Sequence, residues 1–355
     1  MRVLGIESSC DETAFAVVEN GVRVLSNAIA SQIDLHARYG GVVPEIASRA
    51  HLEAVVAMHR AALQEAGVTM DDIDAIAVTR GPGLSGCLLV GTEYAKALAL
   101  RHGKPLIAVH HIAGHIDSVN IGRTATAWGD PVEARAAFAP YVALVVSGGH
   151  SSLVHVRGPM DFLVLGETLD DAVGEAYDKV AKLLGLGYPG GPAMDRLAGE
   201  GHPQAFDLPR PMVHSGDYNF SFSGLKTSVA RTVEKHRAES GARELAPRFL
   251  ADLAASFQAA CVDVLLRKAA RALEETRVGR LAITGGVACN RGLRAEAARR
   301  FPKVQIAIPA SEFCTDNAAM IAGLGGVLGG EGLRSGLGLN ALPGLGLGDE
   351  GRWQE

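Results

Sequence analysis

The sequence has 355 residues, of which 48% are hydrophobic and 21% charged, and its formal net charge is −5 at pH 7. This is a globular composition with core for one large or two medium domains, and it excludes a global positive field that would attract nucleic acid or anionic membranes. The five cysteines form no Cys-x-x-Cys pair. Without a signal-peptide pattern or an apolar run of ~18 residues, we expect a cytoplasmic protein.

The first third of the chain predicts an α/β lobe. Short apolar segments separated by polar turns predict three consecutive strands, and helical spacing ending at a glycine predicts the first long helix. The predicted elements are strands at 2–8, 13–19 and 23–31, a helix at 45–67, a strand at 74–80, a helix at 87–103, a strand at 104–110 and a histidine-rich helix. Residues Gly122 to Ala139 are predicted as an irregular connector.

The same pattern then restarts. The later elements are strands at 141–149, 151–158 and 162–167, helices at 170–187 and 244–277, a strand at 280–286, a helix at 288–301, a strand at 304–309 and a helix starting near Cys314. This repetition predicts two similar lobes around a cleft, at 1–118 and 119–330, and a returning C-terminal helix could complete the first lobe. The Gly/Leu-rich residues 331–355 predict a loosely ordered tail.

The segment from Val109 to Asp117 holds three of the twelve histidines. His111 and His115 are four residues apart, so on a helix they share a face, roughly 5–6 Å apart at Cβ, which suits two ligands of one metal. A surface helix or a buried hydrogen-bonded cluster would also explain them. Asp316 is a candidate third ligand, although it or Thr315 could instead cap the last helix. Two histidines and one carboxylate leave coordination positions open for a substrate.

Glycine-rich turns follow several predicted strands. The Ser-Gly-Gly turn at 147–149 can offer backbone N–H groups to a phosphate, and a plain hairpin turn is the alternative. Asp11 and Glu12 occupy the corresponding turn of the first lobe. The strand, Gly-Gly turn and helix over 283–290 can hold the base or ribose of a nucleotide near a helix N-terminus.

Nine motifs carry a family resemblance. In chain order they are GIESSCDET, PEIASRAH, GPGLSGCLLVG, VHHIAGHI, VVSGGHSSL, EAYDKVAKLLGLGYPGGP, FSFSGLKTS, ITGGVACNRGLR and FCTDNAAMIAG. Together, over residues 1 to about 325, they resemble the bacterial TsaD family, the tRNA N6-adenosine threonylcarbamoyltransferases. The resemblance implies the duplicated actin/Hsp70/sugar-kinase-like fold, in agreement with the repeated strand pattern.

The resemblance also implies site residues. The family binds Fe²⁺ or Zn²⁺, and its metal ligands correspond to His111, His115 and Asp316 of this sequence. The acidic residues near the reacting centre of the family correspond to Asp11 and Glu12. The positions that match binding of the adenylate-bearing substrate are Val145, Val146, Ser147, Gly148, Gly149, Asp178, Gly191, Asp195 and Asn290. Archaeal and eukaryotic relatives have a tyrosine before this Ser-Gly segment as a further metal ligand. Val145 stands here instead, so water or substrate would fill that place.

The implied reaction transfers a threonylcarbamoyl group from threonylcarbamoyl-adenylate to N6 of adenosine 37 in tRNAs that read ANN codons, and AMP leaves. The implied partners are tRNA, the inactive paralogue TsaB and the ATPase TsaE. We expect helices 45–66 and 85–101 to form the paralogue interface. The basic stretches 291–303 and 222–231 are candidate tRNA contacts, and a solvated helix face is the alternative for both.

Three other functions are less consistent with the sequence. Phosphotransferases of this fold use nucleotide-bound magnesium, which does not require the His-x-x-x-His pair. A metallopeptidase of the His-Glu-x-x-His type would need a glutamate after its first histidine, and this chain has Ile112 after His111. An inactive scaffold paralogue would be expected to lose the metal ligands, whereas all three candidates are present.

Overall fold

The computed structural model describes residues 1–122, 127–241 and 244–355. The chain divides into two compact units. The first unit contains residues 1–139, 157–162 and 307–355, and the second contains residues 140–156 and 163–306. The chain therefore leaves the first unit, builds the second, and returns to complete the first.

The first unit contains a five-stranded sheet. Its strands are β1 (Arg2–Glu7), β2 (Glu12–Glu19), β3 (Arg23–Ser31), β4 (Ala75–Gly81) and β5 (Leu106–His110). The order is β3-β2-β1-β4-β5, in which β1, β2 and β3 pair antiparallel and β4 and β5 run parallel to β1. The predicted strands of this region are confirmed, and β3 and β5 form the edges.

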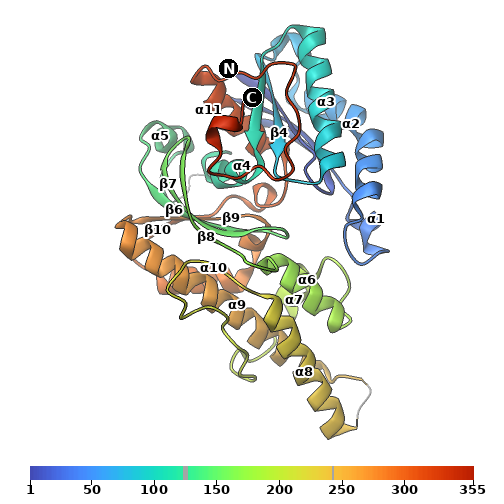
Figure 1. Ribbon diagram of the computed structural model, residues 1–355, viewed down its shortest axis with the longest axis vertical. Helices are drawn as coiled ribbons and strands as arrows, with labels where there is room; N and C mark the ends of the chain where they lie inside the picture. The colour runs from blue at the N-terminus through green and yellow to red at the C-terminus, as the bar shows by residue number, and fades with distance from the viewer. Residues whose placement is uncertain (123–126, 242–243) are drawn as a thin grey trace. The chain divides into compact units, whose positions relative to one another are not determined.

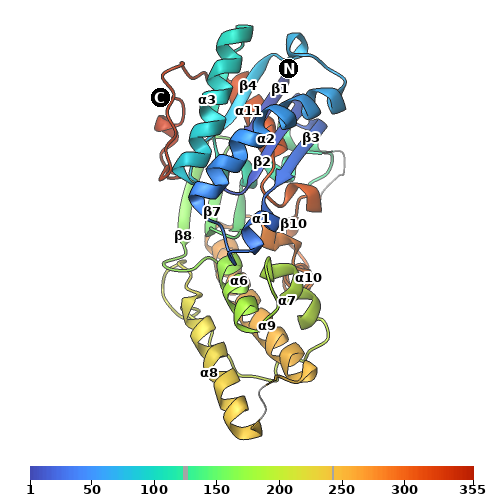
Figure 2. The same cartoon turned by 90° about the vertical axis from the view of Figure 1, so that its right-hand side faces the viewer.

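Helices cover both faces of this sheet (Figures 1 and 2). The helices of this unit are α1 (Ile33–Ala37), α2 (Pro44–Ala66), α3 (Ser85–His102), α4 (His111–Asp117), α5 (Pro131–Ala136) and α11 (Ala318–Gly330). Of these, α2 and α3 pack on one face of the sheet and α11 packs on the other. Leu4 and Ile6 of β1 join a buried core with Val55 of α2. Gly5 faces the other way, because a Cβ there would lie 2.7 Å from the amide nitrogen of Ala322 in α11. Strand alternation therefore separates an α2/α3 face from an α11 face.

The second unit contains a sheet of matching topology. Its strands are β6 (Tyr141–Val146), β7 (Ser151–Gly158), β8 (Asp161–Glu167), β9 (Arg280–Thr284) and β10 (Gln305–Ala307). The order β10-β9-β6-β7-β8 repeats that of the first sheet, with β6 in the place of β1. As in the first sheet, the central strand pairs antiparallel with the next strand, β7, and parallel with β9. The predicted duplication is confirmed.

Five helices complete the second unit. They are α6 (Val173–Leu183), α7 (Gly190–Ala198), α8 (Ser223–Ser240), α9 (Pro247–Thr276) and α10 (Arg291–Arg300). Among the described residues, α9 is the one helix that is long and apolar enough to cross a membrane, but 67% of its most apolar window is buried inside the protein. Such burial is typical of a core helix.

Three local expectations were wrong. The connector predicted as irregular from Gly122 to Ala139 contains helix α5. Residues 123–126 of this connector lie outside the described residues. The sequence Tyr-Pro-Gly-Gly-Pro at 188–192 predicts a Gly-Pro turn, but Gly190 begins helix α7. The helix expected from residue 288 begins at Arg291, since Asn290 caps it by accepting a hydrogen bond from the Leu293 N–H at 2.8 Å. Helix α8 was not predicted.

The expectation of a loosely ordered tail at 331–355 was also wrong. Leu339, Leu345, Leu347 and Trp353 are buried, and the Trp353 side chain is completely so. Although the segment is rich in glycine and leucine, its apolar residues pack within the first unit. This segment, coloured dark red in Figure 1, follows α11 to the C-terminus.

Candidate metal centre and substrate-binding residues

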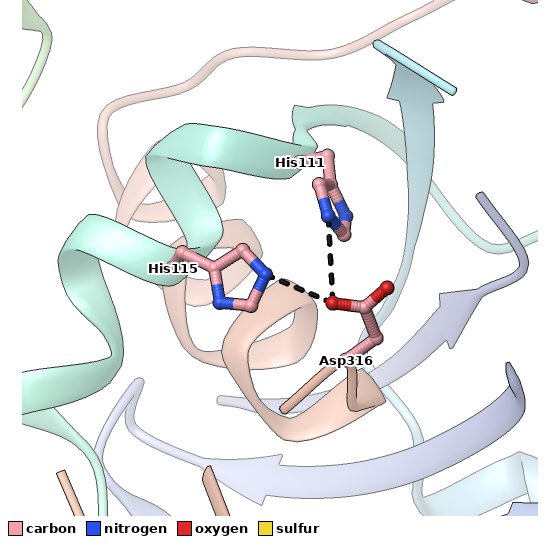
Figure 3. Close-up of side chains that lie close together, drawn as sticks. All are labelled: His111, His115 and Asp316. Atoms are coloured by element: carbon pink, nitrogen blue, oxygen red, sulfur yellow. Dashed lines mark hydrogen bonds and ion pairs between the residues drawn. The ribbon is translucent and has the colours of Figure 1, made fainter. Parts of the chain in front are cut away.

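His111 and His115 lie on α4 and converge with Asp316, which precedes α11 (Figure 3). The two rings are 4.8 Å apart. Nε2 of His115 lies 3.0 Å from Oδ1 of Asp316, and Nε2 of His111 lies 3.6 Å from the same oxygen. One ligand atom from each residue falls within 4.8 Å of the others. Residues about 200 positions apart thus form one compact group with two nitrogens and one oxygen.

Asp316 does not cap α11. The cap is Asn317, whose Oδ1 accepts a hydrogen bond from the Met320 N–H at 3.0 Å. The alternative role for Asp316 or Thr315 as the helix cap was therefore wrong. The Asp316 side chain is 22% exposed, whereas those of His111 and His115 are 6% and 0% exposed. The group is accordingly most open on its carboxylate side.

Glu7 is a buried residue behind this group that the sequence did not reveal. Its Oε2 lies 3.0 Å from Nδ1 of His111 and also accepts from the Thr79 hydroxyl at 2.6 Å, while Oε1 accepts from the Ser9 N–H at 2.6 Å. A carboxylate on the far nitrogen of a histidine fixes the ring so that Nε2 faces a metal. The available signal was an acidic residue at the end of an apolar strand.

The charges of Glu7 and His111 depend on each other. Burial raises the pKa of Glu7, but the nearby His111 and their hydrogen bond lower it, and the net pKa lies below its usual value. Burial lowers the pKa of His111, but Glu7 and Asp316 raise it to about 9. A proton and a metal therefore compete for His111, so metal binding here would release a proton.

The donor set fits a divalent transition metal. Zinc binds histidine nitrogen and carboxylate oxygen at about 2.0–2.2 Å, so ligands of one ion lie roughly 3–4 Å apart. The separations of 3.0 and 3.6 Å between Asp316 Oδ1 and the two Nε2 atoms fall in this range. Imidazole suits both iron and zinc. Among the described residues, no group forms a hydrogen bond with Nδ1 of the buried His115. Of the two histidines, therefore, His111 is the one whose Nδ1 contacts a carboxylate, that of Glu7.

Asp11 and Glu12 lie at the turn from β1 into β2. The Asp11 carbonyl accepts from the Gln32 N–H at 3.0 Å, and Oε1 of Glu12 accepts from the Ser31 hydroxyl at 3.2 Å. Burial raises the pKa of Glu12 to about 9, with Asp316 and Asp11 adding to the rise. The surroundings of Glu12 therefore favour its protonated form.

The Ser-Gly-Gly turn joins β6 to β7 in the second unit. Val145 and Val146 are completely buried in β6, so only their backbones could meet a ligand. The Ser147 N–H donates to the His150 carbonyl at 2.8 Å and closes the hairpin. Gly148 and Gly149 are exposed, and among the described residues no atom lies within 4 Å of a Cβ added to either. The amides of these two glycines are the accessible part of the predicted phosphate-binding turn.

The remaining predicted binding residues tie helices of the second unit together. Oδ1 of Asp178 accepts from the Gly190 N–H at 2.7 Å, which joins α6 to the start of α7. Asp195 accepts from Nε of Arg291 at 2.7 Å, and the Asn290 amide donates to Gln258 of α9 at 2.6 Å. Gly191 is half-buried at the beginning of α7. These contacts give Asp178, Asp195 and Asn290 structural roles beside their predicted one.

The two basic stretches differ in how far their charges are paired. On α10, Arg291 pairs with Asp195 at 2.7 Å, Arg299 with Glu296 at 2.6 Å and Arg300 with Asp263 at 3.0 Å. These pairs favour the solvated-face interpretation for 291–303. On α8, Lys226 and Arg231 are exposed.

The comparisons with known proteins identify the family. The family model described as "TsaD: tRNA N6-adenosine threonylcarbamoyltransferase" matches residues 23–323. The chain belongs to the TsaD family. A curated relative from Geobacillus kaustophilus, named tRNA N6-adenosine threonylcarbamoyltransferase, is 54% identical over 97% of this chain and 96% of its own length. As a TsaD member, the chain is a transferase that modifies tRNA.

Solved structures support the fold of this TsaD member. HypF from T. kodakarensis superposes with a TM-score of 0.58 at 17% identity, over 93% of this chain and 48% of HypF. The activator of 2-hydroxyisocaproyl-CoA dehydratase from Clostridium difficile superposes with a TM-score of 0.51 at 14% identity, over 94% and 97% of the two chains. The predicted actin/Hsp70/sugar-kinase-like fold is confirmed.

Proposed function

We propose that this chain transfers the threonylcarbamoyl group of threonylcarbamoyl-adenylate to N6 of adenosine 37 in tRNAs that read ANN codons. N6 attacks the carbamoyl carbon, a C–N bond forms, and the bond from that carbon to the phosphate oxygen breaks. AMP leaves with the bonding electrons, and the N6 proton passes to a base. The product is N6-threonylcarbamoyladenosine (t6A).

The convergence of His111, His115 and Asp316 carries this proposal. Two buried imidazoles share one carboxylate oxygen within 3.6 Å, and Glu7 holds the first ring from behind. A plain structural cluster would not need a carboxylate that is partly open to solvent. These three residues would hold Fe²⁺ or Zn²⁺, which when bound would supply Lewis-acid polarisation and orientation of the substrate.

The other residues have roles that follow from their surroundings. The exposed amides of Gly148 and Gly149 would hold the adenylate phosphate, and the Asp178, Gly191, Asp195 and Asn290 region would receive the nucleoside. Asp11 or Glu12 would accept the N6 proton. To act as the base, Glu12 must first lose its own proton. A metal bound by Asp316 would offset the negative charge of that carboxylate, which is one cause of the raised pKa of Glu12.

The proposed partners follow from the reaction and from exposed surfaces. The tRNA would meet the exposed Lys226 and Arg231 of α8 in preference to the ion-paired arginines of α10. Exposed leucines on α2 and α3 would contact a TsaB-type paralogue, and a TsaE-type ATPase would complete the assembly in the cytoplasm.

A single-turnover assay tests this function. Metal-loaded chain and its partners receive threonylcarbamoyl-adenylate and a tRNA with adenosine 37, and AMP and modified nucleoside are quantified by mass spectrometry. We expect equal amounts of both products. The matched control is the same tRNA with guanosine at position 37, which should remain unmodified. Release of AMP without t6A would contradict the proposal.

A further inference from the structure

The C-terminal tail covers the open edge of the first sheet. β5 is the last strand on that side, and Ser335 pairs with Leu106 through a backbone hydrogen bond of 2.8 Å. The side chain of Gln354 bonds both backbone groups of Ala108, accepting at 3.1 Å and donating at 2.7 Å. An exposed strand edge is satisfied here by two separate parts of the tail.

Arg80 at the end of β4 fixes the middle of the tail. Its Nε donates to the Asn340 carbonyl at 2.9 Å, and its own carbonyl accepts from the Leu342 N–H at 2.8 Å. Its guanidinium also donates to the Arg352 carbonyl. The tail is therefore held by specific contacts and follows one path over β4 and β5.

The tail also contacts His110, the residue directly before α4. Nδ1 of His110 accepts from the Ile112 and Ala113 N–H groups, at 3.1 and 3.4 Å, and so caps the helix that carries both candidate metal ligands. Because Nδ1 accepts, Nε2 carries the hydrogen and donates it to the Leu345 carbonyl of the tail at 3.1 Å.

Trp353 completes this contact. Its ring is completely buried and lies 5.1 Å from the His110 ring. The Trp353 ring also stacks on Phe162, with the ring centroids 5.8 Å apart. The tail thus supplies one hydrogen bond and one ring contact to the His110 side chain.

We propose that the tail positions the metal-binding helix, with His110 as the positioning residue that links Trp353 and Leu345 to the start of α4. His111 is the first residue of α4, so a displaced cap would move the first ligand directly. This inference rests on the metal site proposed above. Groups that orient metal ligands from behind typically change metal affinity about 10–100-fold when removed, and we expect about tenfold here.

Zn²⁺ affinity of the full-length chain, measured by competition with a chromophoric chelator, tests the inference. His110→Ala and Trp353→Ala should each bind Zn²⁺ about tenfold more weakly than wild type. His110→Asn should recover most of the affinity, since asparagine also caps helices. Trp353→Phe retains an aromatic ring and should bind as wild type does. His102→Ala, on α3, is the matched histidine control. Circular dichroism checks that each variant is folded. If His110→Ala does not fold, the Zn²⁺ affinity of Trp353→Ala tests the inference.

The outcomes separate the two proposals. If both alanine variants fold and bind Zn²⁺ as tightly as wild type, while His115→Ala does not bind it, the metal site stands and the positioning role of the tail is overturned. If wild type itself binds no Zn²⁺, the metal site fails and the inference fails with it. Weaker binding in both alanine variants, with recovery in His110→Asn, supports the inference.

Discussion

Glu7 and Glu12 are glutamates of the same sheet, but their surroundings shift their pKa values in opposite directions. Glu7 receives hydrogen bonds from Thr79 and Ser9 and lies beside His111, so its pKa is lowered in spite of complete burial. Glu12 receives one hydroxyl, and burial together with Asp316 and Asp11 raises its pKa to about 9. The surroundings therefore favour the charged form of Glu7 and the protonated form of Glu12.

The raised pKa of Glu12 predicts a pH-dependent stability of the metal-free protein. The folded state binds a proton that the unfolded state releases above its pKa of 4.5, so this contribution is complete below about pH 4.5 and is lost as pH rises to about 9. The slope is at most about 1.4 kcal/mol per pH unit. Glu12→Gln removes the titration, so its unfolding temperature should rise relative to wild type between pH 5 and 9.

Thermal unfolding in the presence of a chelator measures this difference, and Glu45→Gln on the exposed surface of α2 is the control. Parallel pH curves for wild type and Glu12→Gln would show that Glu12 does not hold the extra proton. With metal and adenylate bound, the same variant should lower the single-turnover rate by about 10²–10⁴-fold if Glu12 is the base.

At the scale of elements, the sequence predicted those strands and helices whose pattern of apolar and polar residues lies within the segment itself. The strand triplets are apolar runs, and α2, α3 and α9 have helical spacing and clear ends. Helix α8 could also have been predicted, because its buried residues Leu225, Val229 and Val233 recur at intervals of four. The path of the C-terminal tail could not have been predicted, because its contacts with β5 join residues more than 220 positions apart.

The candidate site shows the same limit. The spacing of His111 and His115 indicates a shared helix face. Asp316 was a candidate third ligand with a helix cap as the alternative, and the family resemblance matched it to a metal ligand. Neither route indicated Glu7. Glu7 depends on Thr79, which lies 72 residues away on another strand. No local pattern shows that the end of β1 faces α4.

The contact between β1 and α11 predicts a strong effect of one methyl group. In Gly5→Ala the new Cβ would lie within 2.7 Å of the Ala322 amide nitrogen, and backbone cannot move aside as a flexible side chain can. We expect a loss of about 1–3 kcal/mol, measured as a lower urea midpoint. Gly224→Ala on α8, where no described atom lies within 4 Å of the new Cβ, is the control and should be neutral or stabilising. Equal midpoints for the two variants would contradict the close packing of α11.

At the scale of the whole molecule, one chain carries two sheets of the same order, and we propose that it also binds a TsaB-type partner. Leu52 on α2 and Leu89 on α3 are 64% and 53% exposed, although their helices cover the first sheet. Leu52→Glu should weaken binding of a TsaB-type paralogue at least about tenfold, as truncation of central interface residues does. Calorimetry measures this affinity. Leu169→Glu in the second unit, at a leucine 66% exposed, is the control. Equal loss in both variants would place the interface elsewhere.

The central claim is that His111, His115 and Asp316 hold a metal on which threonylcarbamoyl transfer depends. The most direct measurement is metal content by elemental analysis together with single-turnover t6A formation, in wild type and His115→Ala. We predict about one metal per wild-type chain, and loss of both metal and at least about 10²-fold of the rate in the variant, with its unfolding temperature retained. Stoichiometric metal and an unchanged rate in folded His115→Ala would contradict the account.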